Sequence, residues 1–385
     1  MKKRQKTSLK NKLKGKEVIT GPAWKGPEVD GITQSLLSKF LVCRERFRIQ
    51  VIEGLKPADR FSKGLEYGNM WHICEEHFAA GNDWLQPLTQ YCARLCQKYP
   101  TDQQEIDKWY NVCKIQFPVY VDFWSKHKDV RSRTPLLQEE NFKVPYELPS
   151  GRVVLLRGKF DSVDLIGKGR SAGIYLQENK SKGDIDEEKM RRQLESGFDL
   201  QTMMYLIALE EFHKREFVVG ETSYSSFPVK GVRYNVVRRP LSGGKGSIRQ
   251  KQGSKNVPAE TASEFYNRLK TDYIEAEPEY FFMRWKVEVS GQDIERFKQQ
   301  CFNPILEQLC DWYTCMMTDL DDPRFDRSIT IKETKQLVHY RMPSGIYNPL
   351  TEGRETEYDE YLLTGNTVGL ERVKNLFPEL ESEKE

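Results

Sequence analysis

Apolar residues recur along this chain with two different spacings. In the first third they recur every three to four residues, which places them on one face of a helix, and Thr33 offers a helix cap. This spacing predicts helices over residues 33–51, 64–80 and 84–128. From position 138 the apolar residues are largely β-branched, leucine or aromatic and form short runs bounded by Gly, Pro and Ser. These runs predict successive antiparallel strands over 141–148, 152–166 and 174–180.

The rest of the chain repeats this change between helical and extended patterns. Helical spacing returns over 186–213, strand patterns follow over 217–229 and 232–237, and helical patterns resume over 262–274 and 291–317. A helix, three strands, a helix and a strand in that order are typical of an α/β fold. We therefore predict a disordered arm (1–16), an α/β core with a helical insertion at about 84–130 (17–240), a mobile Gly-rich loop (241–257), a helical C-terminal part of the same domain (258–345) and an irregular tail (346–385).

Composition limits the class of protein. With 385 residues, of which 38% are hydrophobic, the chain can bury a substantial core. No run approaches the roughly 18 to 20 apolar residues of a membrane helix, and no apolar segment follows the lysine-rich start as in an export signal. Eight cysteines without the spacing of a small disulfide scaffold are typical of reduced thiols. We expect a cytoplasmic protein without a membrane partner, in the host cytoplasm if a bacteriophage encodes it.

Positive charge is concentrated in two segments, although the net charge is only +3. Eight Lys and Arg residues precede the first acidic residue, Glu17, and such a block is expected to be disordered. It is either an arm that holds phosphate backbones or a solubilising tail. The second segment is the Gly-rich loop, which is not a Walker phosphate loop because glycine follows its lysine where Ser or Thr is required. The candidate DNA-binding residues in and beside this loop are Arg238, Arg239, Lys245, Arg249 and Lys251.

Charged residues with a recognisable chemistry lie on the predicted strands. Asp161 lies on the strand at 152–166, and Glu178 and Lys180 lie at the end of the next strand. Neighbouring antiparallel strands hold their residues in a fixed register, so the two carboxylates can converge on one cation. Lys180 points to the same face as Glu178 because the two are two residues apart. This set suits metal-dependent phosphodiester cleavage, in which the ion activates water and neutralises charge on the phosphate.

Polar residues on the neighbouring helices extend this candidate site. Gln201 and Tyr205 are one helical turn apart, so both can face the strands and contact the scissile nucleotide or hold Lys180. Further upstream, His72 offers an imidazole that can complete the metal shell. Asp164 is an alternative to Asp161, but a β-bulge would be needed to turn it toward the same ion.

Three short motifs follow the glycine-rich approach to His72 in order, namely Gly158-Lys159-Phe160-Asp161, Glu178-Asn179-Lys180 and Gln201-Thr202-Met203-Met204-Tyr205. With them the chain resembles the PD-(D/E)xK nuclease superfamily over about residues 33–205. Within it, the chain is similar to the RecB-type exonucleases, relatives of the AddB, CRISPR adaptation and bacteriophage recombination nucleases. The proline of the superfamily name is absent, and no helicase signature precedes the motifs.

The resemblance implies a fold and a role for each motif residue. The implied fold is a restriction-endonuclease-like core, in which a central mixed sheet is flanked by helices. The implied metal ligands are His72, Asp161 and Glu178, with the backbone carbonyl of Asn179. Lys180 would be the catalytic lysine, and Gln201 with Tyr205 would form the Q-x-x-x-Y element of this branch.

Some RecB-type nucleases also hold a [4Fe-4S] cluster, with one cysteine before the histidine motif and three after the core. The positions of Cys43, Cys301, Cys310 and Cys315 agree with that order. The spacing of the last three is wider than the family pattern. The segment 301–312 also has the pattern of an amphipathic helix with small buried thiols.

Together these features predict a Mg²⁺- or Mn²⁺-dependent deoxyribonuclease, and most specifically an exonuclease that resects or trims DNA ends in recombination or repair. A histidine ligand makes Mn²⁺ at least as acceptable as Mg²⁺. The alternatives are a structure-selective endonuclease on the same fold, a non-catalytic DNA-binding scaffold and a ribonuclease. Besides DNA, the expected partners are a helicase or a single-strand annealing or binding protein.

Overall fold

The computed structural model describes residues 23–42, 44–127, 133–195, 199–214, 217–242, 248–255 and 257–318, with short segments between 330 and 380. The predicted arm at 1–16 and most of the predicted tail lie outside the described residues. The chain divides into two compact units. Unit 1 comprises Met1–Asp59, Pro145–Arg157 and Asn303–Glu385, and unit 2 comprises Arg60–Val144 and Gly158–Phe302.

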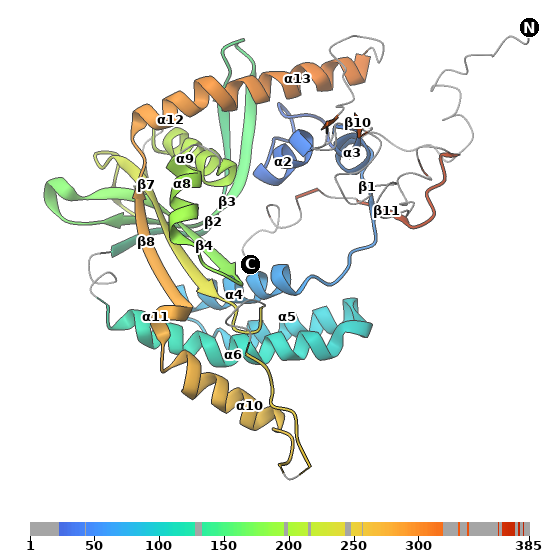
Figure 1. The fold of residues 1–385 in the computed structure, drawn as a ribbon. Coiled ribbons are helices and arrows are strands. Elements are labelled where there is room, and N and C mark those ends of the chain that lie inside the picture. The colour runs from blue at the N-terminus through green and yellow to red at the C-terminus, as the bar shows by residue number, and fades with distance from the viewer. Residues whose placement is uncertain are drawn as a thin grey trace, which may run out of the picture. The chain divides into compact units, whose positions relative to one another are not determined.

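A five-stranded sheet forms the centre of the fold (Figure 1). Its strands lie in the order β2 (Arg133–Glu147), β3 (Val153–Ile166), β4 (Gly173–Lys182), β7 (Val229–Arg238) and β8 (Phe282–Glu288). β4 and β7 are parallel, whereas β3 with β4 and β7 with β8 are antiparallel. The sheet is therefore mixed, as the resemblance to the nuclease superfamily implied. Parallel pairing requires a crossover, which is supplied by the helices α8 (Glu187–Glu195) and α9 (Leu200–His213).

Helices cover both faces of this sheet. Tyr234 and Asn235 are neighbours on β7, so their side chains point to opposite faces. The Tyr234 hydroxyl donates to Asp199 at the start of α9. The Asn235 amide donates to Glu75 of α4 and to Tyr120 of α6. Helix α9 thus lies on one face, and α4 (Lys63–Ala79) with α6 (Gln103–Ser125) lies on the other (Figure 1), which confirms the predicted α/β class.

The predicted helical insertion consists of α5 (Leu85–Lys98), a 3-10 turn at Pro100–Asp102 and α6. Trp109, Phe117, Tyr120 and Trp124 of α6 are buried, as expected for packing residues. Phe117 and Tyr120 contact Trp71 of α4 edge-on and stack on each other, and Trp109 contacts Tyr67 of α4 edge-on. These contacts fix α4 against α6, and α4 carries His72.

The remaining helical segments of unit 2 are short. They are η3 (Gly169–Ser171), α10 (Ala262–Arg268), η4 (Leu269–Ile274), α11 (Pro278–Phe281), α12 (Gly291–Phe297) and η5 (Lys298–Phe302).

Two predictions differ from the structure in this part of the chain. Strand β8 interrupts the region expected to be helical, and its alternation of buried and exposed residues marks it as a sheet edge. The expected strand at 217–229 is instead a short hairpin of two strands with two residues each, β5 (Val218–Val219) and β6 (Thr222–Ser223). The chain turns between them at Gly220, whose φ is +60°.

Unit 1 has its own aromatic core. Phe47 contacts Trp24 edge-on at 5.4 Å, and Phe40 contacts Trp312 edge-on at 5.5 Å. Its elements are α2 (Gln34–Val42), α3 (Arg44–Phe47), η1 (Arg48–Ile52), β1 (Leu55–Pro57), α13 (Asn303–Thr318), β9 (Thr330–Ile331), β10 (Leu337–Val338) and β11 (Leu370–Arg372). None of the helices in the described part of the chain is both long and apolar enough to span a membrane.

Candidate metal centre and catalytic site

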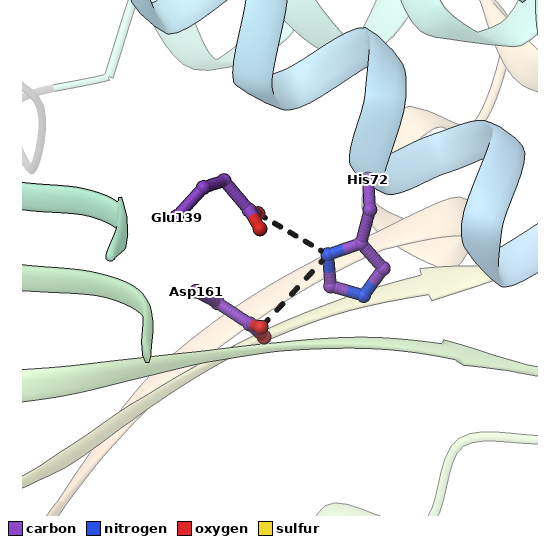
Figure 2. A group of neighbouring side chains, drawn as sticks. All are labelled: His72, Glu139 and Asp161. Atoms are coloured by element: carbon purple, nitrogen blue, oxygen red, sulfur yellow. Dashed lines mark hydrogen bonds and ion pairs between the residues drawn. The ribbon is translucent and has the colours of Figure 1, made fainter. Parts of the chain in front are cut away.

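Three side chains from distant parts of the sequence meet beside the central sheet. Figure 2 shows His72 of α4 pointing toward Glu139 of β2 and Asp161 of β3. The Nδ1 atom of His72 lies 3.4 Å from Oε1 of Glu139 and 3.9 Å from Oδ1 of Asp161. One ligand atom from each residue lies within 4.8 Å of the others. Among the described residues this is the one group of His, Cys, Asp and Glu side chains close enough together to hold a metal ion.

Backbone geometry brings Glu139 into this group. Glu139 has a φ of +47°, the left-handed region that a residue with a side chain adopts at a cost of about 1–3 kcal/mol. Its side chain is buried, and Lys159 donates to its Oε2 at 2.6 Å. Lys159 is the second residue of the Gly158-Lys159-Phe160-Asp161 motif, so one motif supplies both Asp161 and the cation that holds Glu139.

The two carboxylates keep the imidazole positively charged in the protein without metal. Burial opposes the charge on His72, but Asp161 and Glu139 outweigh burial and raise the pKa of His72 to about 9. Burial also acts against the charge on Glu139, yet His72 and Lys159 together lower the pKa of Glu139. Burial and the neighbouring Glu139 raise the pKa of Asp161, although His72, Lys180 and the Asn179 amide act in the opposite direction. The proton on His72 offsets one of the two carboxylates, and a bound divalent cation would take the place of that proton.

Glu178 and Lys180 of β4 form the adjacent part of the site. Lys180 Nζ lies 2.6 Å from Oε2 of Glu178, and Gln201 Nε2 of α9 donates to the same oxygen at 3.3 Å. The other oxygen of Glu178, Oε1, is buried and has no hydrogen-bond partner in the described structure. Burial and the neighbouring Asp161 raise the pKa of Glu178 despite Lys180. A backbone link joins the two parts, because the Asn179 amide donates to Oδ2 of Asp161 at 2.7 Å.

This set of donors fits a divalent cation. Carboxylate oxygens are the ligands that Mg²⁺ prefers, and an imidazole beside them suits Mn²⁺ as well. The unpartnered oxygen of Glu178 is the strongest indication, since a buried carboxylate oxygen without a partner is costly. His72, Glu139, Asp161 and Glu178 are the side chains that could hold the ion.

Other predicted site residues have clear positions. The Asn179 side chain accepts from Gln177 and Asn235, so only its backbone carbonyl is left for the predicted ligand role. Tyr205 packs edge-on against Phe142 and Phe160, with ring centres 5.4 and 6.1 Å apart, and is half-buried. These contacts make Tyr205 part of the support beneath Asp161.

Asp164, the alternative to Asp161, is not part of this group. It is fully buried and forms ion pairs at 2.8 Å with Arg133 and Arg233. Ser162 also donates to its Oδ1 atom. These bonds occupy the Asp164 carboxylate, which is not part of the histidine and carboxylate group, so the structure gives Asp164 an internal role.

The predicted DNA-binding residues fall into three groups. Arg238 is buried, stacks on Tyr280 at 4.0 Å and pairs with Asp184 at 2.8 Å, so its guanidinium is held by the protein. Arg239 is half-buried and donates to Ser181. Lys245 lies outside the described residues, whereas the side chains of Arg249 and Lys251 are exposed.

The cysteine prediction is not resolved by this structure. Cys43 lies outside the described residues. Cys301 is exposed in unit 2, whereas Cys310 and Cys315 are buried on α13 of unit 1. Burial raises the pKa of the Cys310 thiol to about 12. The [4Fe-4S] cluster stays a prediction.

Two carboxylates beside the site were missed in the sequence. Glu139 precedes Glu140 at the start of a predicted strand, where a pair of acids looks like an exposed strand end. Glu75 lies one helical turn after His72, and its Oε1 atom accepts from Tyr120 and Asn235. Burial raises the pKa of Glu75, whose Oε2 atom has no partner in the described part of the chain. Because Glu75 is three residues after His72 on the predicted helix, the sequence could have indicated that the two side chains lie on the same helical face.

Comparison with known families agrees with this geometry. The family model described as the PD-(D/E)XK nuclease superfamily matches residues 32–315, which cover both the site and the central sheet. Comparison with curated proteins gives no significant match. Nucleases of this superfamily use divalent metal ions, and a nuclease of this kind implies DNA as the substrate. The chain, with its mixed sheet and its histidine and carboxylate cluster, belongs to the PD-(D/E)XK nuclease superfamily.

Proposed function

We propose that this protein is an exonuclease of the RecB-type branch, which resects or trims DNA ends in recombination or repair. The strongest support is the group of His72 from α4 and Asp161 from β3 with Glu139, which the Asn179 amide joins to β4, the strand that carries Glu178 and Lys180. Apart from Glu139, these are the motif residues by which the sequence resembles that branch. Mg²⁺ or Mn²⁺ is the proposed cofactor.

In this proposal His72, Asp161 and Glu178 hold the ion, with the Asn179 carbonyl, and Glu139 adds a further carboxylate. The ion, when bound, supplies Lewis-acid activation of water and neutralises phosphate charge. Gln201 fixes the orientation of Glu178 through its hydrogen bond. Tyr205 keeps β3 in place through its aromatic contacts.

Lys180 is the proposed electrostatic catalyst. Burial opposes its charge, but Glu178 and Asp161 outweigh burial and raise the pKa of Lys180, so it is a cation at neutral pH. A buried cation placed beside the carboxylates can neutralise the negative charge that develops on the phosphate in the transition state. Removing one such preorganised group lowers turnover by about 10²–10³-fold in other enzymes.

The proposed biological setting follows from the same resemblance. A helicase or a single-strand annealing or binding protein is the proposed partner, and a [4Fe-4S] cluster at Cys43, Cys301, Cys310 and Cys315 is a separate proposal. Iron content and absorbance of the purified protein would test the cluster independently of activity.

The first experiment compares end-labelled linear DNA with closed circular DNA in EDTA, Mg²⁺ and Mn²⁺. We expect metal-dependent loss of the linear substrate, and a decrease of about 10²–10³-fold in Lys180→Ala. Lys168→Ala is a matched control, because Lys168 is exposed at the turn before β4, at the opposite end of that strand.

Each other outcome changes the conclusion. Cleavage of the closed circle would support a structure-selective endonuclease on the same fold. DNA binding without metal-dependent cleavage of either substrate would support the non-catalytic scaffold. Equal losses in the Lys180 and Lys168 variants would remove Lys180 from the proposed site. Digestion of RNA in preference to DNA would support the ribonuclease.

A further inference from the structure

Buried polar side chains lie on the face of the central sheet that α4 and α6 cover. Asn235 of β7 is 1% exposed, and its neighbour across the strands is Asn179 of β4, which is also buried. Arg233 and Gln177, two residues before them, form a second buried pair of neighbours. Burying a polar group is costly unless it is hydrogen-bonded, so the partners of these side chains matter.

The side-chain amide of Asn235 joins α4 to β4. Its nitrogen atom donates to Oε1 of Glu75 on α4 and to Oδ1 of Asn179 on β4, each at 2.9 Å. The Tyr120 hydroxyl of α6 lies 2.7 Å from the same nitrogen and donates to Glu75 at 2.6 Å. One amide group therefore connects α4, α6 and β4.

The residues that Asn235 connects lie beside two proposed metal ligands. Glu75 follows His72 by three residues, which is about one turn of α4. The backbone amide of Asn179 donates to Oδ2 of Asp161 at 2.7 Å, and its carbonyl is the proposed further ligand. Asn235 thus lies between the support of His72 on one side and the support of Asp161 on the other.

Arg284 of the edge strand β8 fixes the orientation of this amide. Its Nε and Nη2 atoms donate to Oδ1 of Asn235 at 3.2 and 3.1 Å. With the oxygen bonded in this way, the nitrogen faces Glu75 and Asn179, and a flipped amide would lose bonds on both sides. The Arg284 guanidinium itself lies over the ring of Trp124 at 3.9 Å, which helps to hold it in place.

We propose that Asn235 is a positioning residue of the metal centre, which sets the distance between His72 of α4 and Asp161 of β3. This proposal rests on the proposed nuclease function, because a bound ion is what makes that distance matter. A functional centre needs its groups within about 0.5 Å of the productive geometry. An apolar side chain at position 235 could fill the same volume, but it could not fix the spacing through directional bonds.

A purely structural role is the competing explanation. A buried polar network can specify one packing of a core without any connection to a functional site. That role predicts that removal of the Asn235 amide changes the stability alone, whereas positioning predicts that metal binding also becomes weaker. Metal affinity of a folded variant is therefore the property to measure.

The first test is isothermal titration of Mn²⁺ into the full chain, with wild type compared to Asn235→Leu, which keeps the side-chain volume. Each partner of Asn235 retains another bond in this variant, namely Glu75 with Tyr120, Asn179 with Gln177, and Arg284 with Tyr120. We expect the Mn²⁺ affinity to decrease about tenfold, the lower end of the range for residues that hold metal ligands in place. Wild-type affinity in folded Asn235→Leu would overturn the proposal.

Gln116→Met is the matched control. Gln116 is a fully buried amide that also joins α4 to β7, since it accepts from Tyr67 at 2.6 Å and donates to the carbonyl of Arg238 at 2.9 Å. Because these bonds go to Tyr67 and Arg238 instead of Glu75 and Asn179, this variant should lose stability and bind Mn²⁺ like wild type. An equal loss of Mn²⁺ affinity in both variants would also overturn the proposal.

Thermal unfolding without metal shows whether each variant is folded. If Asn235→Leu does not fold, Asn235→Ser takes its place, because its side chain is smaller than that of asparagine and also lacks the amide. The same decrease in Mn²⁺ affinity is expected, and wild-type affinity in Asn235→Ser would count equally against the proposal.

Failure of the proposed function gives a different pattern of results. In that case Asn235→Leu would still weaken Mn²⁺ binding, while wild type would cleave neither linear nor circular DNA with Mg²⁺ or Mn²⁺. Cleavage by wild type together with an unchanged Mn²⁺ affinity in Asn235→Leu would refute only the positioning role. If wild type bound neither ion, both the proposed function and the positioning role would fail.

Discussion

Asp161 and Asp164 are three residues apart on β3, and the structure gives them opposite roles that two isosteric substitutions can separate. Asp161 lies with His72 and Glu139 in the proposed metal centre. Asp164 is outside that group and pairs with Arg133 and Arg233. Asp161→Asn should therefore weaken metal binding, and Asp164→Asn should destabilise the fold.

The size of the stability change follows from burial. Asp164 is fully buried and Arg233 is 1% exposed, so Asp164→Asn breaks an ion pair in the core. Breaking a buried ion pair in this way costs about 3–5 kcal/mol of unfolding free energy. For a unit of this size each kcal/mol shifts the melting temperature by about 2–4 °C, so we expect a decrease of roughly 6–20 °C.

Asp161→Asn should leave the metal-free stability unchanged or raised. Burial raises the pKa of Asp161, so its charged form is less favourable in the folded protein than in the unfolded chain at neutral pH. The asparagine oxygen can still accept the hydrogen bond from the Asn179 amide. Removing the charge therefore removes a destabilising contribution.

The assay is thermal unfolding with and without Mn²⁺, together with isothermal titration of Mn²⁺. Asp164→Asn should melt early but bind Mn²⁺ with wild-type affinity at a temperature where it is folded. Asp161→Asn should melt at or above the metal-free wild type and gain little stability from Mn²⁺. Loss of Mn²⁺ affinity in Asp164→Asn with an unchanged melting temperature would refute this assignment and make Asp164 the ligand.

Three further predictions concern the charges of unit 2. Glu139→Gln should weaken Mn²⁺ binding by about 10- to 100-fold in isothermal titration, because it removes a carboxylate from the centre; unchanged affinity would exclude Glu139. The affinity for Mn²⁺ should increase up to about pH 9 and be roughly 100-fold weaker at pH 7, because a proton on His72 competes with the ion; a flat profile would contradict this. Finally, the ion pair with Arg268 lowers the pKa of Glu260 to about 2. Its contribution is present above the unfolded pKa of 4.5 and is lost as the pH falls toward 2. Denaturation curves of wild type and Glu260→Gln should therefore differ at pH 6 and converge near pH 2.

Most of the fold was visible in the sequence, since helices and strands leave periodic patterns in neighbouring residues. The strands β3 and β4 and the helix α4 follow those patterns closely, whereas the ranges 84–128 and 186–213, each predicted as helical, contain two helices apiece, α5 with α6 and α8 with α9. Strand β8 was missed because seven residues between two helical segments carry little periodic information. Its pairing with β7, such as Tyr234 with Trp285, is what makes it a strand.

The sequence by itself determined the α/β order and the motif residues His72, Asp161, Glu178 and Lys180, because spacing along a strand or helix dictates which side chains share a face. Only the tertiary structure decided that Glu139 joins them, since this requires two strands and a helix to meet and the backbone to turn at a positive φ. Burial, which depends on every neighbouring element, likewise decided which charges are neutralised within the protein and which are left for a ligand.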